Sequence, residues 1–236
     1  MAGRRNSNDP RNSLFMEYVR FLNHFNPKVF IMENVMGILS MKTENNESCI
    51  DIITDHLGQN YNYIICKLYA SDFGAPQNRR RVIVLGVRKD LGIIPTEPTP
   101  LTPGDLRPAV GAILQPREEV DASHYLSERG IAGINAKKER SKEKGHGFGA
   151  QFLKLDKPSY TISARYWKDG SDALLKYDEQ NIRRLTVLEL KRIQSFPDDY
   201  VLCGTKKDQI MQIGNAVACK FAKALGEHVL RTLGGV

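Results

Sequence analysis

Hydrophobic side chains along the first part of the chain follow helical and strand-like patterns in turn. They recur at helical spacing over residues 14–25 and again over residues 50–57, where Gly58 ends the second pattern. Three short apolar runs have the length of buried strands, at residues 29–32, 63–66 and 82–85. This alternation predicts an α/β fold with a parallel or mixed sheet covered by helices.

The middle of the chain differs from the first part in its proline content and in its weak hydrophobic periodicity. Six of the 11 prolines fall between Pro95 and Pro116, a density that favours a linker or a domain boundary. Periodicity stays weak up to about residue 180, and the charged run at residues 137–144 is typical of a solvated loop or helix face. We therefore expect an irregular region between two ordered parts.

Order returns near residue 182. Thr186 and Glu189 have the spacing of a capping box, which predicts a helix that runs to about Ser195 and stops before Pro197. The last predicted helix is amphipathic, with apolar positions at Val217, Phe221, Leu225 and Val229.

Charge is distributed unevenly along the chain. The 236 residues carry 34 Lys and Arg against 27 Asp and Glu, a net charge of +7. Residues 95–180 hold 13 of each sign, so the whole surplus lies in the flanks, with 21 basic against 14 acidic residues. A polyanionic partner such as nucleic acid is therefore expected at the ordered parts.

Composition excludes several other classes of protein. Hydrophobic residues make up 41% and charged residues 26%, as in ordinary globular proteins, and no apolar run is long enough to span a membrane. The first residues lack the apolar core of a signal peptide. The four cysteines have no CxxC spacing, so we expect no metal cluster, no disulfide framework and a reducing cytoplasm.

Glu33-Asn34-Val35 follows the first predicted strand directly. In open α/β sheets, ligands bind at the carboxyl ends of the strands. A carboxylate there is able to exchange a proton with a ring nitrogen of a ligand. The alternative is a strand-end Glu that caps a helix or pairs with an Arg.

Gln77-Asn78-Arg79-Arg80-Arg81 leads into the third predicted strand. Strand alternation would direct Arg79 and Arg81 to one side and Arg80 to the other. Paired guanidinium groups suit a phosphate or a carbonyl oxygen. The alternative is a basic strand edge that discourages aggregation.

Gly214-Asn215-Ala216-Val217 precedes the last amphipathic pattern and is expected to open that helix. Taken alone, an Asn at this place is explained as a simple N-cap.

The order of these segments resembles the C5-cytosine-specific DNA methyltransferase family. Glu33-Asn34-Val35 matches its ENV motif, and Gln77, Arg79 and Arg81 match its Q-x-R-x-R motif. Further matches are a Thr-Ile/Leu signature at residues 158–162, a long motif at residues 184–197 and a GN-x-V motif at residues 214–217. Each motif alone is weak, but five in family order are specific, and the resemblance covers the whole chain.

The resemblance implies a fold and an activity. The fold is an S-adenosylmethionine-dependent methyltransferase (Rossmann-like) α/β sheet, incomplete at its N-terminal side, with a small, irregular, mostly β target-recognition domain. Residues 1–93 and 212–236 would form the partial catalytic domain, and residues 94–211 the recognition domain. Such enzymes transfer methyl from S-adenosylmethionine to C5 of a cytosine flipped out of a specific duplex sequence, as part of restriction–modification systems.

The resemblance also implies catalytic roles. Glu33 would hold or protonate N3 of the cytosine, and Arg81 would bond its O2. Arg79 would steady the nucleophilic cysteine and a nearby phosphate. Asn215 and Val217 would lie beside the cofactor.

Contacts with double-stranded DNA are implied elsewhere in the chain. Thr161 would contact the DNA backbone or help to carry the recognition loops, and Gln77 belongs to the same DNA-binding set. The start of the chain is similar to the family's mobile loop that closes over DNA, where Arg11, Arg4 and Arg5 would contact phosphates.

Two family motifs are absent from these 236 residues: the F-x-G-x-G cofactor segment and the Pro-Cys-Gln segment with the nucleophile. Cys66 and Cys219 have the surroundings of packing residues, and Cys49 and Cys203 lie in no motif. We therefore expect an incomplete cofactor pocket and no activity of this chain alone. Apolar faces at residues 29–32 and 221–229 would then be exposed, which makes the isolated chain poorly soluble or dependent on a partner.

Three explanations of the absent motifs stay open. The start codon could be an internal Met of a longer reading frame, the gene could be truncated, or a separate N-terminal methyltransferase polypeptide could supply both motifs. The alternative function is a non-catalytic DNA-binding or specificity subunit, or a truncated remnant. Such a module has no need of Glu33, Arg79 and Arg81 together.

Overall fold

The computed structural model describes residues 14–43, 45–143, 150–171 and 173–234. The predicted phosphate contacts Arg4, Arg5 and Arg11 lie outside the described residues. The helices are α1 (Leu14–Phe25), α2 (Cys49–Gly58), α3 (Glu128–Glu143), α4 (Tyr166–Asp169), α5 (Val187–Ile193), α6 (Lys206–Asn215) and α7 (Cys219–Thr232). The strands are β1 (Val29–Val35), β2 (Tyr61–Tyr69), β3 (Arg80–Arg88), β4 (Leu174–Lys176) and β5 (Ile182–Arg184).

The chain divides into two compact units. Unit 1 comprises Met1–Leu68, Arg80–Thr99 and Leu225–Val236, and unit 2 comprises Tyr69–Arg79 and Pro100–Ala224. The expected boundary after residue 93 is near the unit boundary at Thr99. The expected return at residue 212 is 12 residues before the second boundary at Ala224. The assignment of a catalytic and a recognition domain to these parts stays a prediction.

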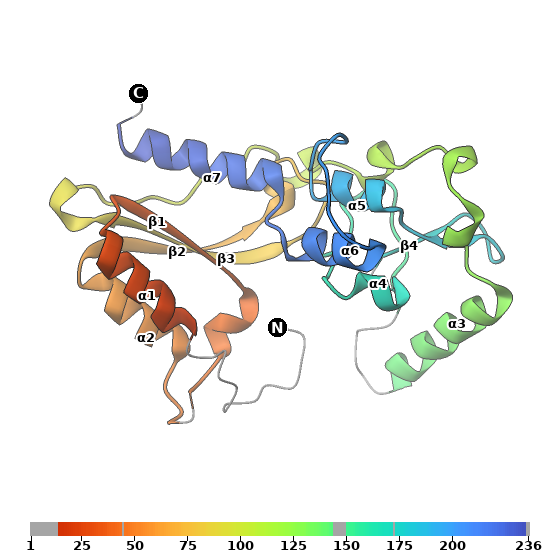
Figure 1. Ribbon diagram of the computed structural model, residues 1–236, viewed down its shortest axis with the longest axis horizontal. Coiled ribbons are helices and arrows are strands. Elements are labelled where there is room, and N and C mark those ends of the chain that lie inside the picture. Colours follow the sequence, from red (N-terminus) through yellow and green to blue (C-terminus); the bar gives the residue numbers. More distant parts are fainter. Residues whose placement is uncertain (1–13, 44, 144–149, 172, 235–236) are drawn as a thin grey trace. The chain divides into compact units, whose positions relative to one another are not determined.

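The sheet of unit 1 has the strand order β1-β3-β2 (Figure 1). β1 and β3 are antiparallel, with Val35 opposite Arg81. Ala70 N donates to Arg79 O, and Lys89 N donates to Asn60 O, so β2 and β3 also run in opposite directions. β1 and β2 therefore share one direction, but β3 is inserted between them. The expected parallel or mixed sheet was wrong for these three strands, because the insertion of β3 makes both pairs of neighbours antiparallel.

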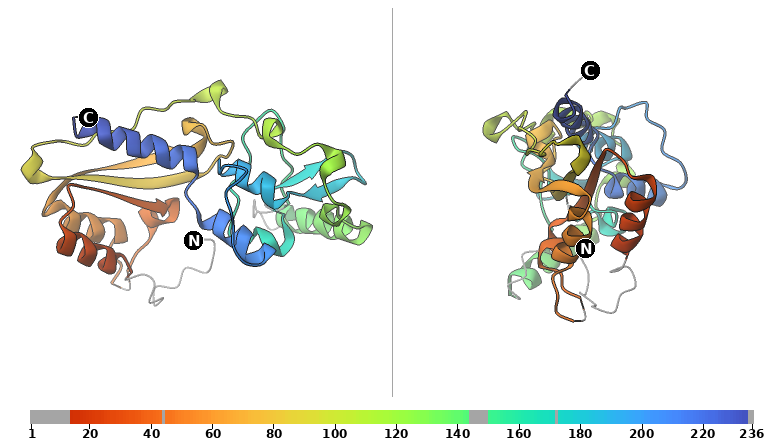
Figure 2. Two further views of the ribbon diagram at one scale, coloured as in Figure 1. Left: turned by 45° about the horizontal axis from the view of Figure 1, so that its top comes forward. Right: turned by 90° about the vertical axis from the view of Figure 1, so that its left-hand side faces the viewer.

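Helices α1 and α2 cover one face of this sheet (Figures 1 and 2). Their apolar stripes meet inward-facing side chains of β1 and β3 in a single core. The core comprises Val19, Leu22, Phe30, Met32, Ile50, Ile53, Leu57, Val82 and Val84, among others. Gly86 lies opposite Phe30, and a Cβ on Gly86 would meet the Phe30 ring at 2.1 Å. Only glycine fits there without displacing the ring.

The expected exposure of apolar faces was largely wrong. Phe30 and Met32 are buried beneath α1 and α2, and Phe221 and Leu225 are buried in α7. Only Ile31, on the other side of the strand, is 38% exposed within residues 29–32. Strand alternation accounts for the difference, because one face of β1 is covered.

Unit 2 is more helical than the expected mostly β domain. Its named strands within the described residues are the antiparallel pair β4 and β5, each of three residues. Helices α5 and α6 enclose its main core together with Tyr166 of α4, and the charged run at residues 137–143 belongs to α3. The core residues are Val110, Leu153, Ile162, Tyr166, Ala173, Leu185, Leu190, Ile193, Ile210 and Ile213.

The GN-x-V segment runs from the last turn of α6 toward the start of α7. Asn215 is the last residue of α6, and α7 begins only at Cys219. The expectation that this segment opens the last helix, and the N-cap alternative for Asn215, were therefore wrong. A second capping box explains the difference: Thr205 accepts from the backbone of Asp208 and starts α6.

Candidate functional site

Glu33 and Arg81 form an ion pair in unit 1. Glu33 lies near the end of β1, and the antiparallel register brings the start of β3 beside it. Arg81 Nε donates to Glu33 Oε1 at 2.7 Å, and Arg81 Nη1 donates to the carbonyl of Arg80 at 2.8 Å. Pairing of Glu33 with an Arg is thus what the structure shows, and it is compatible with a ligand role.

Hydrogen bonds hold the Glu33–Arg81 pair in place, but the pair remains partly accessible to solvent. The Arg81 side chain is 11% exposed, whereas that of Glu33 is 29% exposed. In such a pair, the carboxyl group can share a proton with a ligand atom, and the guanidinium can donate an N–H hydrogen bond to a neighbouring ligand atom. This combination complements a ring in which a basic nitrogen and a carbonyl oxygen are neighbours. A pyrimidine edge has that arrangement.

Arg79 has different surroundings from Arg81. It belongs to unit 2 and is only 4% exposed. Its Nη1 donates to the carbonyl of Ile162 at 3.3 Å, and its Nη2 donates to the carbonyl of Gly214 at 3.0 Å. The guanidinium therefore joins two backbone segments that are distant in sequence.

Gln77 and Thr161 lie on neighbouring backbone segments of unit 2. Gln77 is completely buried, and its Oε1 accepts from the backbone N–H of Ile162 at 3.2 Å. The Thr161 hydroxyl donates to the carbonyl of Asn78 at 3.1 Å. Gln77 thus lies beneath the segment that carries Thr161, and its surroundings are those of a supporting residue.

The segment from Gly214 to Val217 is held from two sides. Gln194, fully buried at the end of α5, donates to the carbonyls of Ile213 and Ala216 at 2.8 and 3.2 Å. Gly214 approaches the backbone of Ala164 so closely that a Cβ would meet its nitrogen at 2.4 Å. Asn215 is exposed on this fixed turn, and Val217 is half-buried.

A profile of the family "C-5 cytosine-specific DNA methylase" matches residues 1–231 of the chain. The chain belongs to this family. The resemblance read from the motifs is thereby confirmed.

Curated relatives of this family have similar sequences. The type II methyltransferase M.SsoII of Shigella sonnei is 33% identical over 227 residues, which cover 96% of this chain and 59% of that protein. M1.ScrFI of Lactococcus lactis subsp. cremoris is 32% identical over 228 residues, which cover 95% of this chain and 57% of the relative. The chain thus spans somewhat more than half the length of these relatives.

Solved structures have a similar fold. The Dnmt2 methyltransferase of S. pombe superposes with a TM-score of 0.72 at 18% identity, covering 97% of this chain and 75% of that one. The Entamoeba histolytica methyltransferase EhMeth gives the same TM-score over 96% and 70% of the two chains. The expected methyltransferase α/β fold is confirmed. No helix in the described part of the chain is long and apolar enough to cross a membrane.

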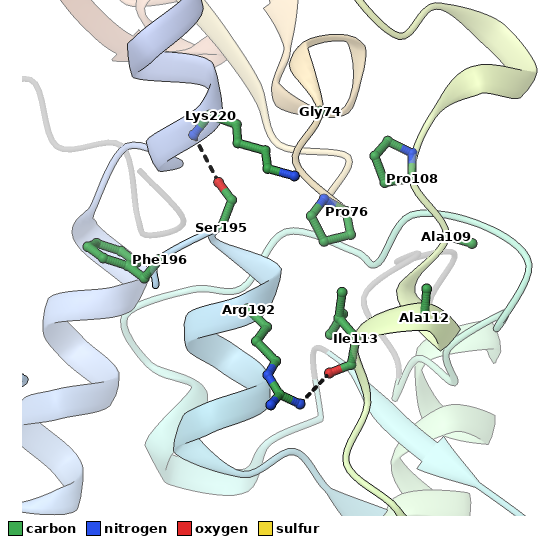
Figure 3. Close-up of a pocket in the computed structure, with 10 residues that line it drawn as sticks. All are labelled: Gly74, Pro76, Pro108, Ala109, Ala112, Ile113, Arg192, Ser195, Phe196 and Lys220. Atoms are coloured by element: carbon green, nitrogen blue, oxygen red, sulfur yellow. Dashed lines mark hydrogen bonds between the residues drawn. The ribbon is translucent and has the colours of Figure 1, made fainter. Parts of the chain in front are cut away.

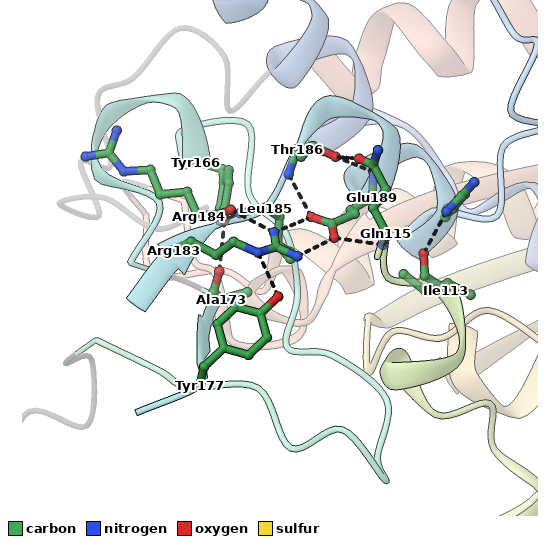
Figure 4. Close-up of polar contacts among 11 residues, drawn as sticks. Ile113, Gln115, Tyr166, Ala173, Tyr177, Arg183, Arg184, Leu185, Thr186 and Glu189 are labelled. Carbon is green, nitrogen blue, oxygen red and sulfur yellow. Dashed lines mark hydrogen bonds and ion pairs between the residues drawn. The ribbon is translucent and has the colours of Figure 1, made fainter. Parts of the chain in front are cut away.

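The family motif at residues 184–197 adjoins a buried ion pair that the sequence did not reveal (Figure 4). Arg183 and Glu189 have side chains that are 0% exposed and form two hydrogen bonds of 2.8 and 2.7 Å. Burial disfavours the charge of Arg183, but hydrogen bonds to Glu189 and Tyr177 outweigh it and raise its pKa. Glu189 was predicted only as a capping residue. No spacing rule marks Arg183 as its partner.

A pocket of about 300 Å³ lies in unit 2, close to the end of the same motif (Figure 3). Its walls are mostly apolar and comprise Gly74, Pro76, Pro108, Ala109, Ala112, Ile113, Arg192, Ser195, Phe196 and Lys220. Lys220 N donates to Ser195 Oγ at 3.0 Å, and Arg192 donates to the carbonyl of Ile113 at 3.2 Å. The lining includes no carboxylate or imidazole, and its charged side chains are those of Arg192 and Lys220.

The cysteines lack the features of a nucleophile. Burial and then Glu97 raise the pKa of Cys66 to about 11, and burial also raises the pKa of Cys49 and Cys219. Cys203 is exposed and lies before α6. Since the thiolate is the reactive form, a raised pKa makes a thiol inert.

Proposed function

We propose that this chain is the cytosine-holding and DNA-recognising part of a DNA cytosine-5 methyltransferase of a restriction–modification system. The observation that carries the proposal is the Glu33–Arg81 ion pair of 2.7 Å between β1 and β3. Membership of the C-5 cytosine-specific DNA methylase family supports it.

The two side chains would act on a cytosine that has been flipped out of the duplex, because C5 is unreachable within the stack. Arg81 would donate to O2 and orient the ring. Glu33 would hold a proton at N3. When a thiolate adds to C6, electron density moves toward C5 and N3, and the proton from Glu33 together with the Arg81 charge stabilises it. C5 thereby becomes nucleophilic.

S-adenosylmethionine would supply the methyl group. Asn215 and Val217 would hold one edge of this cofactor, since the Asn215 side chain is exposed and the turn beneath it is held by Gln194. The described residues offer only this edge. These two residues would therefore help to position the cofactor. We infer that the rest of the cofactor pocket is formed by other residues.

Double-stranded DNA is the proposed substrate. Thr161 is half-buried at the surface of unit 2 and would contact the backbone, with Gln77 supporting its segment from below. Arg79 would act near the nucleophile and phosphate, as the family motif implies, or through the segments that it joins. Arg4, Arg5 and Arg11 would contact phosphates. The free cysteines of the described part fit a bacterial cytoplasm, where this substrate lies.

A tritium-transfer assay tests the proposal. The 236-residue chain alone should transfer no label from S-adenosylmethionine to DNA, because it holds neither the Pro-Cys-Gln nor the F-x-G-x-G segment. The protein expressed from its complete reading frame, or the chain mixed with a separate polypeptide that carries both segments, should label cytosine at C5.

The outcomes separate the two candidate functions. Labelling by the chain alone would contradict the account of the nucleophile. DNA binding without labelling by the completed enzyme would favour the non-catalytic specificity subunit.

A further inference from the structure

Two segments of unit 2, which the proposed function assigns to different ligands, meet at one side chain. The segment around Ile162 carries Thr161, proposed for DNA, and the segment around Gly214 carries Asn215, proposed for the cofactor. Arg79 donates to the carbonyls of both Ile162 and Gly214.

We propose that Arg79 is a positioning residue that couples DNA binding to cofactor binding by fixing these two segments to one rigid guanidinium. The inference rests on the proposed function and adds an energetic link between its two ligands. The planar guanidinium of Arg79 bonds the two carbonyls from two nitrogens at a fixed separation, whereas an ammonium group would have to bond both from a single nitrogen.

Burial of Arg79 strengthens the link that its two hydrogen bonds form between the Ile162 and Gly214 segments. Arg79 is only 4% exposed, so water offers little replacement for a lost bond. The backbone of Ala164, two residues after Ile162, also lies directly against Gly214, where a Cβ would come within 2.4 Å. A shift of the Ile162 segment therefore reaches Gly214 through a hydrogen-bonded path and through direct packing.

The Ile162 segment and the Gly214 segment are also each held by a glutamine that bonds only that segment. Gln77 accepts from Ile162 N at 3.2 Å, whereas Gln194 donates to the carbonyls of Ile213 and Ala216. Gln77→Met should thus weaken DNA binding, and Gln194→Met should weaken cofactor binding. Arg79 differs from both because it contacts the two segments together.

The test is a thermodynamic cycle on the protein from its complete reading frame, or on the chain combined with a separate polypeptide that carries the Pro-Cys-Gln and F-x-G-x-G segments. A 40-base-pair duplex is first selected from a randomised pool by the parent protein. The dissociation constant of S-adenosylhomocysteine is then measured with and without this duplex. The parent should show a coupling factor of roughly 5–150-fold, and Arg79→Lys should reduce it to less than about 2-fold.

Arg107→Lys is the matched control. Arg107 also lies in unit 2 and forms two hydrogen bonds with Asp72, at 2.7 and 3.2 Å, but its side chain bonds neither segment. The same Arg-to-Lys exchange should therefore leave the coupling factor unchanged.

Hydrogen exchange supplies a second measurement that needs no variant. S-adenosylhomocysteine alone should slow exchange of the Ile162 amide, which lies on the other segment, at least about 3-fold. An unchanged rate would overturn the coupling.

The remaining outcomes are also decisive. Coupling that survives in Arg79→Lys, or a parent without coupling, would overturn this inference and leave the proposed function intact. If the parent selects no duplex at all, the proposed function fails and the inference fails with it.

Discussion

At the scale of single residues, burial decides what an ion pair does. Arg183 and Glu189 are completely buried and satisfy each other with two hydrogen bonds. Arg192 and Asp198 make an equally short contact of 2.6 Å at the surface, where water competes. The Glu33–Arg81 pair lies between these cases, which suits a group that must stay in place and still reach a ligand.

Glu189→Gln should lower the free energy of unfolding by about 3–5 kcal/mol, because it leaves the Arg183 charge buried without its partner. Urea unfolding followed by circular dichroism measures the loss. Asp198→Asn is the control at the exposed pair and should hardly move the midpoint. Equal effects of both substitutions would contradict the burial argument.

Glu33→Gln should lower the rate of methyl transfer by roughly 10²–10⁴-fold in the completed enzyme, because an amide can donate a hydrogen bond to N3 but cannot transfer a proton to it. Thermal unfolding should change little, since the Gln amide oxygen still accepts from Arg81. Asp90→Asn, at an exposed pair with Arg88, is the control and should keep full activity. A loss of activity that matches a loss of folded protein would point to a structural role instead.

Iodoacetamide at pH 8 should label Cys203 first in the folded chain. Cys66 stays a protonated thiol at this pH because its pKa is raised to about 11, and Cys49 is buried. Mass spectrometry of the peptides identifies the labelled residue. Rapid labelling of Cys66 would show that its thiol is a reactive nucleophile after all.

The motif residues show how far sequence reasoning reaches at this scale. Pairing of Glu33 with an Arg was one of the alternatives from the sequence, and the antiparallel register makes Arg81 the partner. Strand alternation was expected to direct Arg79 to the side of Arg81. Arg79 and Arg81 are buried and Arg80 is exposed, in agreement with this alternation. Arg79 precedes β3, however, and bonds two carbonyls that are 83 and 135 residues away in sequence. No local pattern predicts such partners.

At the scale of elements, local signals predicted those helices and strands that carry strong periodicity. Helices α1 and α2, and strands β1, β2 and β3, lie where the hydrophobic pattern placed them, and α5 lies where the capping box of Thr186 and Glu189 placed it. Helix α6 was missed although Thr205 and Asp208 form a capping box, because its apolar stripe is weak. The insertion of β3 between β1 and β2 was missed because strand order depends on contacts across the whole chain.

Two glycines give opposite predictions for the same added methyl group. Gly226→Ala should stabilise the protein by about 0.5–1 kcal/mol, because Gly226 lies within α7 and a Cβ there meets nothing within 4 Å. Gly86→Ala should destabilise it by at least about 1–3 kcal/mol, because the Cβ would overlap the Phe30 ring. Urea unfolding of both variants provides the comparison. The same sign for both would contradict the packing of Phe30 against β3.

At the scale of the whole molecule, the family and the general fold could be predicted from five short motifs in order. The internal architecture of unit 2 could not, because its segments are short and depend on tertiary contacts such as those of Arg183 and Gln194. The molecule combines one unit in which Glu33 and Arg81 form an ion pair with another in which Arg79 joins the segments around Ile162 and Gly214.

Bisulfite sequencing tests most directly whether the enzyme methylates cytosine and whether this methylation depends on Glu33. The protein from its complete reading frame, or the chain together with a separate polypeptide that carries the Pro-Cys-Gln and F-x-G-x-G segments, is expressed in a bacterial strain that lacks 5-methylcytosine. It is expressed as the parent protein and as Glu33→Gln. If Glu33 acts on the cytosine as proposed, the parent produces 5-methylcytosine at one duplex sequence. Glu33→Gln loses nearly all of this methylation at equal protein levels. Full methylation by Glu33→Gln, or no methylated cytosine with the parent, would contradict the proposal.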